Sequence, residues 1–296
     1  MALLKPNFFI IGAPKCGTTS LHYYLSNHSQ VTMSTPKEPH YFSTDIENGG
    51  IRNMEEYLDC FAHGDKKTLV VGESSTLYLY SRVAVQNIYD YDKESKFIVM
   101  VRNPIEIAQS FHQVALKVFG ETETDFEKAW FMEENRIAGK KIPKGCIDQK
   151  LILYGNIAKI GQQIARFLSN IPRDNIHFIT YDDFKSSTKH EYKKVLKFLK
   201  LSNEVPMNFP LYNKSKSIKN ETVTKLTNYA SSLKKRLKIK TNFNLANKIH
   251  NANVTEQPLI KLPKSFLLKM DKYFKYDINL LSQLIKKDLS KWRVSK

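Results

Sequence analysis

The sequence predicts an α/β fold in which helices flank a central parallel β-sheet, giving three α/β/α layers. Short apolar runs within residues 8–11, 69–73 and 97–101 are typical of strands that are buried on both faces of a parallel sheet. Helical spacing follows these strands and also covers residues 121–135 and 148–168. With 296 residues and a hydrophobic content of 42%, the chain can bury a sizeable core.

We expect a single domain over residues 1–296. Residues 1–216 form its motif-bearing core, and residues 217–296 form a basic, mainly helical part of the same domain. No apolar run approaches the roughly 20 residues that a bilayer span needs, and the first strand begins too early to leave room for a cleaved leader. We therefore predict a cytoplasmic protein without a membrane partner. The sequence carries no signal for an oligomeric state.

The positive charge is concentrated in the C-terminal part of the chain. The formal net charge is +17, yet residues 185–296 hold 26 Lys and Arg against 7 Asp and Glu. Such a region could attract a polyanion, or it could be a solvated lysine-rich surface. We favour the solvated surface, so nucleic acid is not expected as a partner.

The three cysteines are Cys16, Cys60 and Cys146, which lie far apart in the sequence. They lack the spacing of metal ligands, so we expect free thiols in a reducing compartment. Cys16 lies in the loop that carries the first motif, where a thiol with a lowered pKa would be reactive.

The first motif is the glycine-containing loop between the strand at residues 8–11 and a helix that starts at Thr18. Backbone N–H groups and the positive end of the helix dipole both point at such a loop, which makes it a P-loop-like phosphate cradle. Gly12 and Gly17 have the spacing of a Walker A loop, but Thr18 stands where its lysine should be, and the lysine is Lys15. The candidate phosphate ligands are Lys15, Cys16, Gly17, Thr18, Thr19 and Ser20.

The second motif follows the strand at residues 97–101, which ends in Arg102-Asn103-Pro104. A nucleotide-hydrolysing enzyme usually places a magnesium-binding aspartate after such a strand. An arginine at the carboxyl end of a parallel strand suits a phosphate of the ligand itself. Ser110 lies two turns further along the next helix, and His112 follows it.

The third motif is a loop at residues 34–42, where two prolines disfavour a helix. It carries Lys37, Glu38 and His40 next to a Tyr-Phe pair. A carboxylate beside aromatic residues can have a raised pKa and act as a general base near neutral pH.

Together these motifs resemble those of the sulfotransferases that use 3′-phosphoadenosine 5′-phosphosulfate (PAPS), in the heparan-sulfate and bacterial branch. Residues 14–21 resemble the 5′-phosphosulfate loop, Arg102 with Ser110 the 3′-phosphate motif, and residues 37–42 the loop with the catalytic glutamate, here Glu38. The resemblance covers most of residues 7–216. It also implies that Lys214 or Lys216, in a late basic loop, closes over the nucleotide phosphates.

The resemblance implies an in-line transfer of a sulfuryl group from PAPS to a hydroxyl or amine, with 3′-phosphoadenosine 5′-phosphate (PAP) as product and no metal. Glu38 would be the base, and Lys15 would neutralise charge on the leaving oxygen. His112 is a third catalytic candidate, and His40 is a further rival base. A kinase or another NTP-using P-loop enzyme, and a non-catalytic polyanion-binding protein, are the alternatives.

The acceptor implied is a small molecule, a secondary metabolite or a carbohydrate. After Glu73 this chain has Ser74-Ser75-Thr76, where the glycan branch of the family often has a lysine or arginine. That departure weakens the expectation of a heparan-like polyanionic acceptor.

Overall fold

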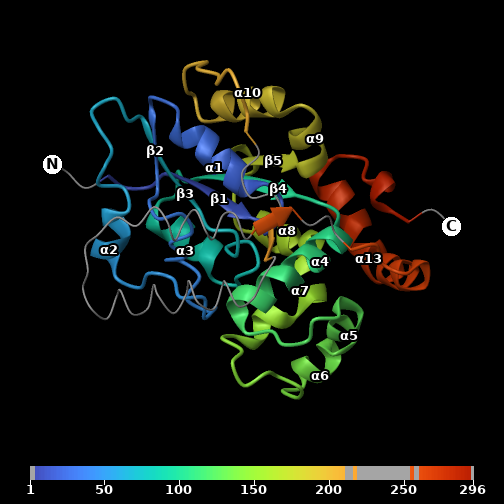
Figure 1. Ribbon diagram of the computed structural model, residues 1–296. Helices are drawn as coiled ribbons and strands as arrows, with labels where there is room; N and C mark the ends of the chain where they lie inside the picture. Colours follow the sequence, from blue (N-terminus) through green and yellow to red (C-terminus); the bar gives the residue numbers. More distant parts are fainter. Residues whose placement is uncertain (1–3, 211–215, 219–253, 257–259, 295–296) are drawn as a thin grey trace. The chain divides into compact units, whose positions relative to one another are not determined.

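A computed structural model of the chain describes residues 4–210, 216–218, 254–256 and 260–294 (Figure 1). The chain forms two compact units, one made of Met1–Pro210 with Leu262–Lys296 and the other of Leu211–Lys261. In the second unit, β6 (Lys216–Ile218) pairs antiparallel with β7 (Val254–Glu256). The single domain over residues 1–296 stays a prediction. Of the part expected to be mainly helical, residues 219–253 lie outside the described residues, whereas Lys264–Ile285 is a helix.

The first unit contains a five-stranded parallel sheet with the strand order β2-β3-β1-β4-β5. From β1 the chain visits β2 and β3 on one side and then β4 and β5 on the other, so the direction of winding reverses beside β1. Open α/β sheets bind ligands at such a switch point, beyond the carboxyl ends of the strands. The strands are β1 (Phe8–Gly12), β2 (Val31–Met33), β3 (Val70–Ser74), β4 (Lys96–Val101) and β5 (Ile176–Thr180).

Helices cover both faces of this sheet, which confirms the predicted fold class; Figure 1 shows α1 and α10 above it and α3, α4 and α8 below it. Every residue of β1 is buried, as are residues 97–101 of β4, because neither strand has a face in contact with water. The main helices are α1 (Thr18–Ser26), α2 (Met54–Asp59), α3 (Ala84–Tyr91), α4 (Pro104–Val114), α8 (Ile160–Leu168), α9 (Tyr181–Ser186), α10 (Thr188–Phe198) and α13 (Lys264–Ile285). Among the described residues, no helix has both the length and the apolar character that a bilayer span requires.

The prediction of one long helix over residues 148–168 is wrong. The segment is helical but is divided into three short helices, η2 (Gln149–Ile152), α7 (Tyr154–Ala158) and α8. Two buried carboxylates explain the breaks. Glu133 accepts the backbone N–H groups of residues 155 and 156, and Asp277 of α13 accepts those of residues 161 and 162. Each carboxylate caps a new helix start, where the N–H groups have no partner within the helix.

The segment expected as one helix over residues 121–135 is likewise divided, into α5 (Phe126–Phe131) and α6 (Glu133–Ile137). Asp125 caps α5 through the backbone N–H of Lys128, which sets the helix start five residues later than expected. Before it, residues 121–125 form a loop around a buried ion pair.

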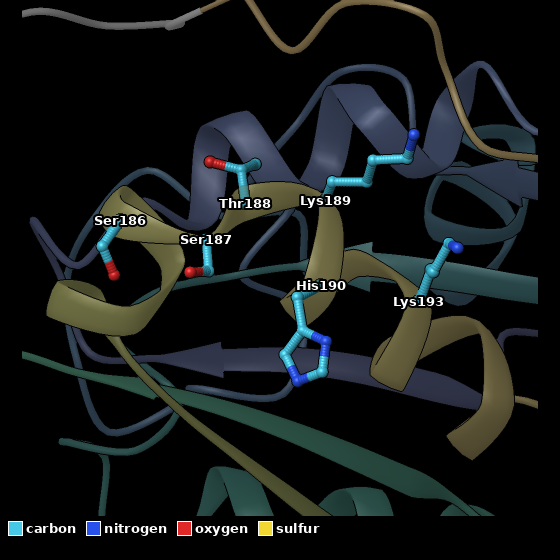
Figure 2. Close-up of a pocket in the computed structure, with 6 residues that line it drawn as sticks. All are labelled: Ser186, Ser187, Thr188, Lys189, His190 and Lys193. Atoms are coloured by element: carbon cyan, nitrogen blue, oxygen red, sulfur yellow. The ribbon is translucent and has the colours of Figure 1, made fainter.

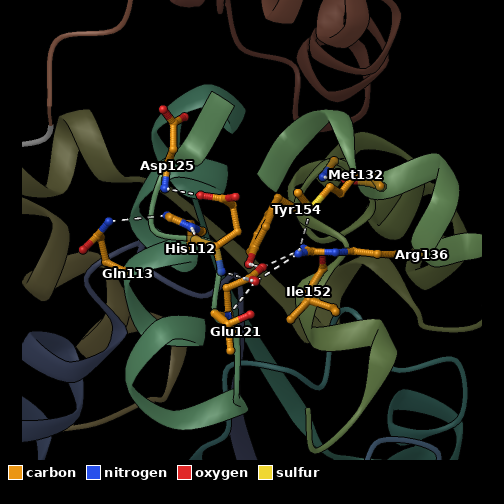
Figure 3. Close-up of polar contacts among 12 residues, drawn as sticks. His112, Gln113, Glu121, Asp125, Met132, Arg136, Ile152 and Tyr154 are labelled. Atoms are coloured by element: carbon orange, nitrogen blue, oxygen red, sulfur yellow. Dashed lines mark hydrogen bonds and ion pairs between the residues drawn. The ribbon is translucent and has the colours of Figure 1, made fainter. Parts of the chain in front are cut away.

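This buried ion pair joins Arg136 to Glu121, whose side chains are 1% and 0% exposed (Figure 3). Glu121 also accepts the hydroxyl of Tyr154 at 2.5 Å and the backbone N–H groups of residues 122 and 123. Burial alone would raise the pKa of Glu121, but the bonds from Arg136 and Tyr154 outweigh it and hold that pKa below its usual value. The cluster fixes the loop after α4 against α6 and α7.

The C-terminal end of the chain returns to the carboxyl edge of the sheet. Trp292, in η4 (Ser290–Trp292), donates its indole N–H to Asp182 at 2.7 Å. The side-chain amide of Asn103 donates to the Trp292 carbonyl at 3.1 Å. The last described residues are therefore tied to the ends of β4 and β5.

We predict that Arg136→Met destabilises the protein by about 3 kcal/mol or more, because it leaves the Glu121 charge buried and unpaired. The measurement is urea unfolding at neutral pH. Lys93→Met is the control, since the pair of Lys93 with Asp90 is 56% and 57% exposed and should contribute less than about 1 kcal/mol.

The effect of Arg136→Met should depend on pH. The pKa of Glu121 in the folded state lies below its unfolded value, so the stabilisation by the pair is present above the unfolded value and is lost as the pH falls through the folded one. The difference between the wild type and Arg136→Met should therefore narrow in acid. A difference that stays constant over that range would contradict this assignment.

Candidate active site

The phosphate loop joins β1 to α1, as expected, and both of its glycines adopt left-handed conformations. Gly12 has φ +137°, and a Cβ there would lie 2.6 Å from the carbonyl oxygen of Thr76. Gly17 is the N-cap of α1 with φ +90°, and a Cβ there would lie 3.2 Å from the ring of Tyr181. Only glycine suits this combination of close contact and conformation.

The side chains of the loop divide into buried and partly exposed ones. Cys16, Thr18 and Ser20 are 0%, 3% and 4% exposed, whereas Lys15 and Thr19 are partly exposed. The first turn of α1 contains no acidic side chain, so nothing there opposes an anion at its positive end. The structure thus leaves a basic, donor-rich edge at the predicted position.

Cys16 can contribute to a ligand only through its backbone in this structure. Its thiol is fully buried and lies 3.5 Å from the Pro14 carbonyl. Burial raises the pKa of the thiol to about 12, which is the opposite of what a reactive cysteine needs.

Lys15 and Arg102, predicted from separate motifs, are brought together by a direct hydrogen bond. The Arg102 guanidinium donates to the Lys15 carbonyl at 3.0 Å. Burial lowers the pKa of Lys15, and the positive charges of Arg102 and Lys117 lower it further, against an opposing effect of Glu38. The loop is therefore the centre of a group of cations that repel one another until an anion is present.

Arg102 is held in place on three sides at the end of β4. Its Nε donates to Glu106 at 2.6 Å, and its guanidinium stacks on the ring of Tyr181 at 4.5 Å. Tyr181 in turn packs against Gly17. Asn103 caps α4 and Pro104 opens that helix. An arginine fixed in this way needs little reorganisation to meet a phosphate.

Glu38 is attached to the start of the phosphate loop through one residue. Its Oε2 accepts the hydroxyl of Thr76 at 3.3 Å, and the carbonyl of the same Thr76 is the group that approaches Gly12. His40 Nε2 lies 3.1 Å from that Oε2, and Lys37 forms an ion pair with the other carboxylate oxygen. Glu38 thus lies beside the phosphate loop.

The expectation of a raised pKa for Glu38 is wrong. Burial acts in that direction, but the hydrogen bond from His40 and the charge of Lys37 outweigh it and hold the pKa of Glu38 at about 2. The aromatic neighbours that suggested a raised pKa, Tyr41 and Phe42, pack against each other and against Tyr57 instead.

The contacts of His112 are with residues other than Lys15, Arg102 and Glu38. It is 0% exposed, its Nε2 lies 2.7 Å from the Glu123 carbonyl, and its ring packs edge-on against Tyr154 (Figure 3). The side-chain amide of Gln113 lies 3.4 Å from its Nδ1. With both ring nitrogens engaged and no exposed surface, this geometry disfavours the predicted catalytic role and makes His112 part of the buried cluster.

The structure does not test the other three predicted ligands, Ser110, Lys214 and Lys216. Ser110 lies in α4 but is only 3% exposed. Lys214 lies outside the described residues. Lys216 is in β6, in the unit that is described by itself. These three assignments stay predictions.

Thr76, Tyr181 and Lys117 lie at the site but belong to none of the predicted motifs. Thr76 belongs to the Ser74-Ser75-Thr76 segment, which drew attention only because it lacks a basic residue. Lys117 lies in η1 (Ala115–Phe119), a π-helical turn after α4. Tyr181 follows the last residue of β5, at the sheet edge that also carries Arg102. The position of Tyr181 at a strand end was the signal that could have found it.

A separate pocket lies at the start of α10 and is not the motif site (Figure 2). Its lining residues come from the α9–α10 connection and the first turns of α10, and none belongs to a predicted motif. In the described part of the chain, no three His, Cys, Asp or Glu side chains form a group suited to a metal ion. The pocket is lined by Ser186, Ser187, Thr188, Lys189, His190 and Lys193.

Comparison with known proteins agrees with the motifs. The family model described as "Sulfotransferase domain" matches residues 5–260. Human carbohydrate sulfotransferase 15 is 24% identical over 255 residues, which cover 66% of this chain and 44% of that protein. Human heparan sulfate glucosamine 3-O-sulfotransferase 3B1 is 28% identical over 216 residues, with coverage of 71% and 50%.

Two further relatives extend this comparison. The membrane-associated sulfotransferase kil1 of Dictyostelium discoideum is 30% identical over 115 residues, which are 39% of this chain and 24% of kil1. The chain thus spans half or less of the length of these curated relatives. A crystal structure of a sulfotransferase from Alicyclobacillus acidocaldarius superposes with a TM-score of 0.71 at 25% identity, covering 98% of this chain and all of the other.

We predict that Cys16 resists alkylation in the folded protein. Because its thiol is buried with a pKa of about 12, iodoacetamide at neutral pH should modify it at least about tenfold more slowly than the partly exposed Cys146. Mass spectrometry of digests taken over time measures both rates, and labelling of the urea-unfolded chain is the control. Labelling of Cys16 as fast as Cys146 would mean that the phosphate loop opens readily.

Proposed function

The chain belongs to the sulfotransferase domain family, and from that premise we propose that it transfers a sulfuryl group from PAPS to a hydroxyl or amine. The observation that carries the proposal is that the phosphate loop contacts both other motifs. Arg102 is bonded to the carbonyl of Lys15, and Thr76 joins the loop to Glu38. These contacts support the proposal, because they bring the loop, Arg102 and Glu38 to one edge of the sheet.

The loop and Arg102 suit a nucleotide that carries phosphate groups on both the 3′ and the 5′ oxygen of its ribose. The N-terminus of α1 with Lys15 would hold the 5′-phosphate. Arg102, fixed by Glu106 and Tyr181, would hold the 3′-phosphate and so set the position of the donor. When bound, PAPS supplies the activated sulfuryl group.

The chemical step needs a base for the acceptor proton. As the acceptor oxygen or nitrogen bonds to sulfur, its proton passes to Glu38, the bond between sulfur and the 5′-phosphate oxygen breaks, and PAP leaves. Lys15 stabilises the charge that develops on that leaving oxygen. His40 keeps Glu38 oriented through the contact at 3.1 Å.

The acceptor class follows from the relatives and stays broad. Carbohydrate sulfotransferase 15 and the heparan sulfate sulfotransferases support a carbohydrate acceptor, and a small molecule or secondary metabolite is retained beside it. Metal independence and a cytoplasmic location are part of the same proposal. The kinase and polyanion-binding alternatives have no specific observation in their favour.

We predict that PAP binds without added metal and that Arg102→Ala weakens this binding by about 30- to 150-fold, the effect of losing about 2 to 3 kcal/mol of charge-assisted hydrogen bonding. Isothermal titration calorimetry measures the affinity. Arg173→Ala is the matched control, because Arg173 stacks on Phe178 at the same 4.5 Å as Arg102 on Tyr181 but at the opposite end of β5. Binding of ATP with Mg²⁺ in place of PAP would overturn the proposed function in favour of a kinase.

We also predict that Lys15→Ala lowers turnover by about 10²- to 10³-fold and that Glu38→Gln lowers it by about 10²- to 10⁴-fold. The assay follows transfer of labelled sulfuryl from PAPS to a panel of carbohydrate and small-molecule acceptors. Equal melting temperatures would show that both variants remain folded. Undiminished turnover in Glu38→Gln would assign the base to His40 instead.

A further inference from the structure

Lys37 is a charged residue of the site that has no role in the mechanism described so far. Its ammonium pairs with Glu38 Oε1, and its side chain is only 13% exposed. A largely buried ammonium is costly unless it is paired. Among the described residues, Glu38 is the carboxylate that forms an ion pair with it.

The backbone is shaped to keep this pair in contact. Glu38 has φ +62° and His40 has φ +53°, both in the left-handed region that non-glycine residues avoid. The loop is held in this form because the His40 N–H donates to Ser75 at 3.0 Å and Arg52 donates to the His40 carbonyl at 3.0 Å. Strained residues that the surrounding structure over-determines are typical of sites with a function.

The hydrogen bond from His40 and the pair with Lys37 together leave Glu38 a weak base while the site is empty. Other groups that act on Glu38 are Lys15 from the phosphate loop, His40 from its own loop and the hydroxyl of Thr76. His22 of α1 adds no charge at neutral pH, because burial and the charge of Lys37 lower its pKa to about 4. A carboxylate with a pKa of about 2 is a poor proton acceptor near neutral pH.

We propose that Lys37 is a positioning residue that couples donor binding to the base: it holds Glu38 until the sulfuryl group of PAPS attracts its ammonium away. This inference rests on the proposed function and extends it. The ammonium exchanges one anionic partner for another, so no bond other than the ion pair is made or broken. Glu38 then becomes more basic only in the presence of a donor that carries a sulfuryl group, while the contact with His40 remains.

The exchange predicts a proton uptake that accompanies PAPS binding and not PAP binding. At about pH 4, Glu38 with its pKa of about 2 is ionised in the free protein. Loss of the Lys37 charge raises that pKa toward the ordinary value of about 4.3, against the hydrogen bond from His40, so a fraction of a proton is taken up. Calorimetric titrations with each nucleotide, in two buffers of different ionisation enthalpy, count the protons taken up. Because the 5′-phosphate of PAP has a second ionisation at about pH 6 that the phosphosulfate of PAPS lacks, the same titrations on Glu38→Gln give the nucleotide contribution, which is subtracted for each nucleotide.

Three variants and one control test the assignment. Lys37→Met should abolish the extra proton uptake and weaken PAPS binding by about tenfold while leaving PAP binding nearly unchanged. Glu38→Gln sets the reference without extra uptake, because it removes the titrating group. Lys37→Arg should retain it, since the charge is kept. Lys66→Met, in an exposed segment before β3, should behave like the wild type.

Equal proton uptake for PAPS and PAP in the wild type after this subtraction would overturn the inference, and so would an undiminished difference in Lys37→Met. Weakened binding of both nucleotides to the same extent in Lys37→Met would also overturn it, because it would make Lys37 a general phosphate ligand. Failure of both nucleotides to bind the wild type would instead overturn the proposed function, and this inference with it.

Discussion

The candidate active site depends on the position of β1 between β3 and β4. Parallel pairing on both sides brings the carboxyl ends of three strands to one edge, and each end supplies a different part of the site. β1 supplies the phosphate loop, β4 supplies Arg102, and the segment after β3 supplies Thr76. The close approach of Gly12 to Thr76 then sets the distance between the loop and Glu38. Helices on both faces keep the strands that position these residues buried and close-packed.

Local sequence patterns predicted the features that local physics decides. The apolar runs gave the strands within a residue or two, and the two glycines with Lys15 gave the phosphate loop and the start of α1. Arg102 at a strand end was predicted because strand ends of a parallel sheet converge. The same reasoning applied to β5 would have pointed to Tyr181.

Features that depend on distant residues were not predictable in this way. The breaks between η2, α7 and α8 are set by Glu133 and by Asp277, which lies more than a hundred residues along the chain from the helix it caps. The pKa of Glu38 is decided by the direction in which a left-handed backbone turns its side chain, and the sequence states only that aromatic residues are near. Histidine is a residue type common in catalysis, but the ring of His112 forms a hydrogen bond with the backbone carbonyl of Glu123, eleven residues later.

The C-terminal end of the chain gives this protein a built-in optical probe. Trp292 is bonded to Asp182, the residue after Tyr181, and to Asn103, the residue after Arg102. Its indole is 4% exposed and Trp130, the second tryptophan, is buried among the rings of α5 and α13. Movement of Arg102 or of the Tyr181 ring that supports it would therefore change the surroundings of one of only two indoles in the chain. Intrinsic fluorescence can thus report on this edge of the sheet without an attached dye.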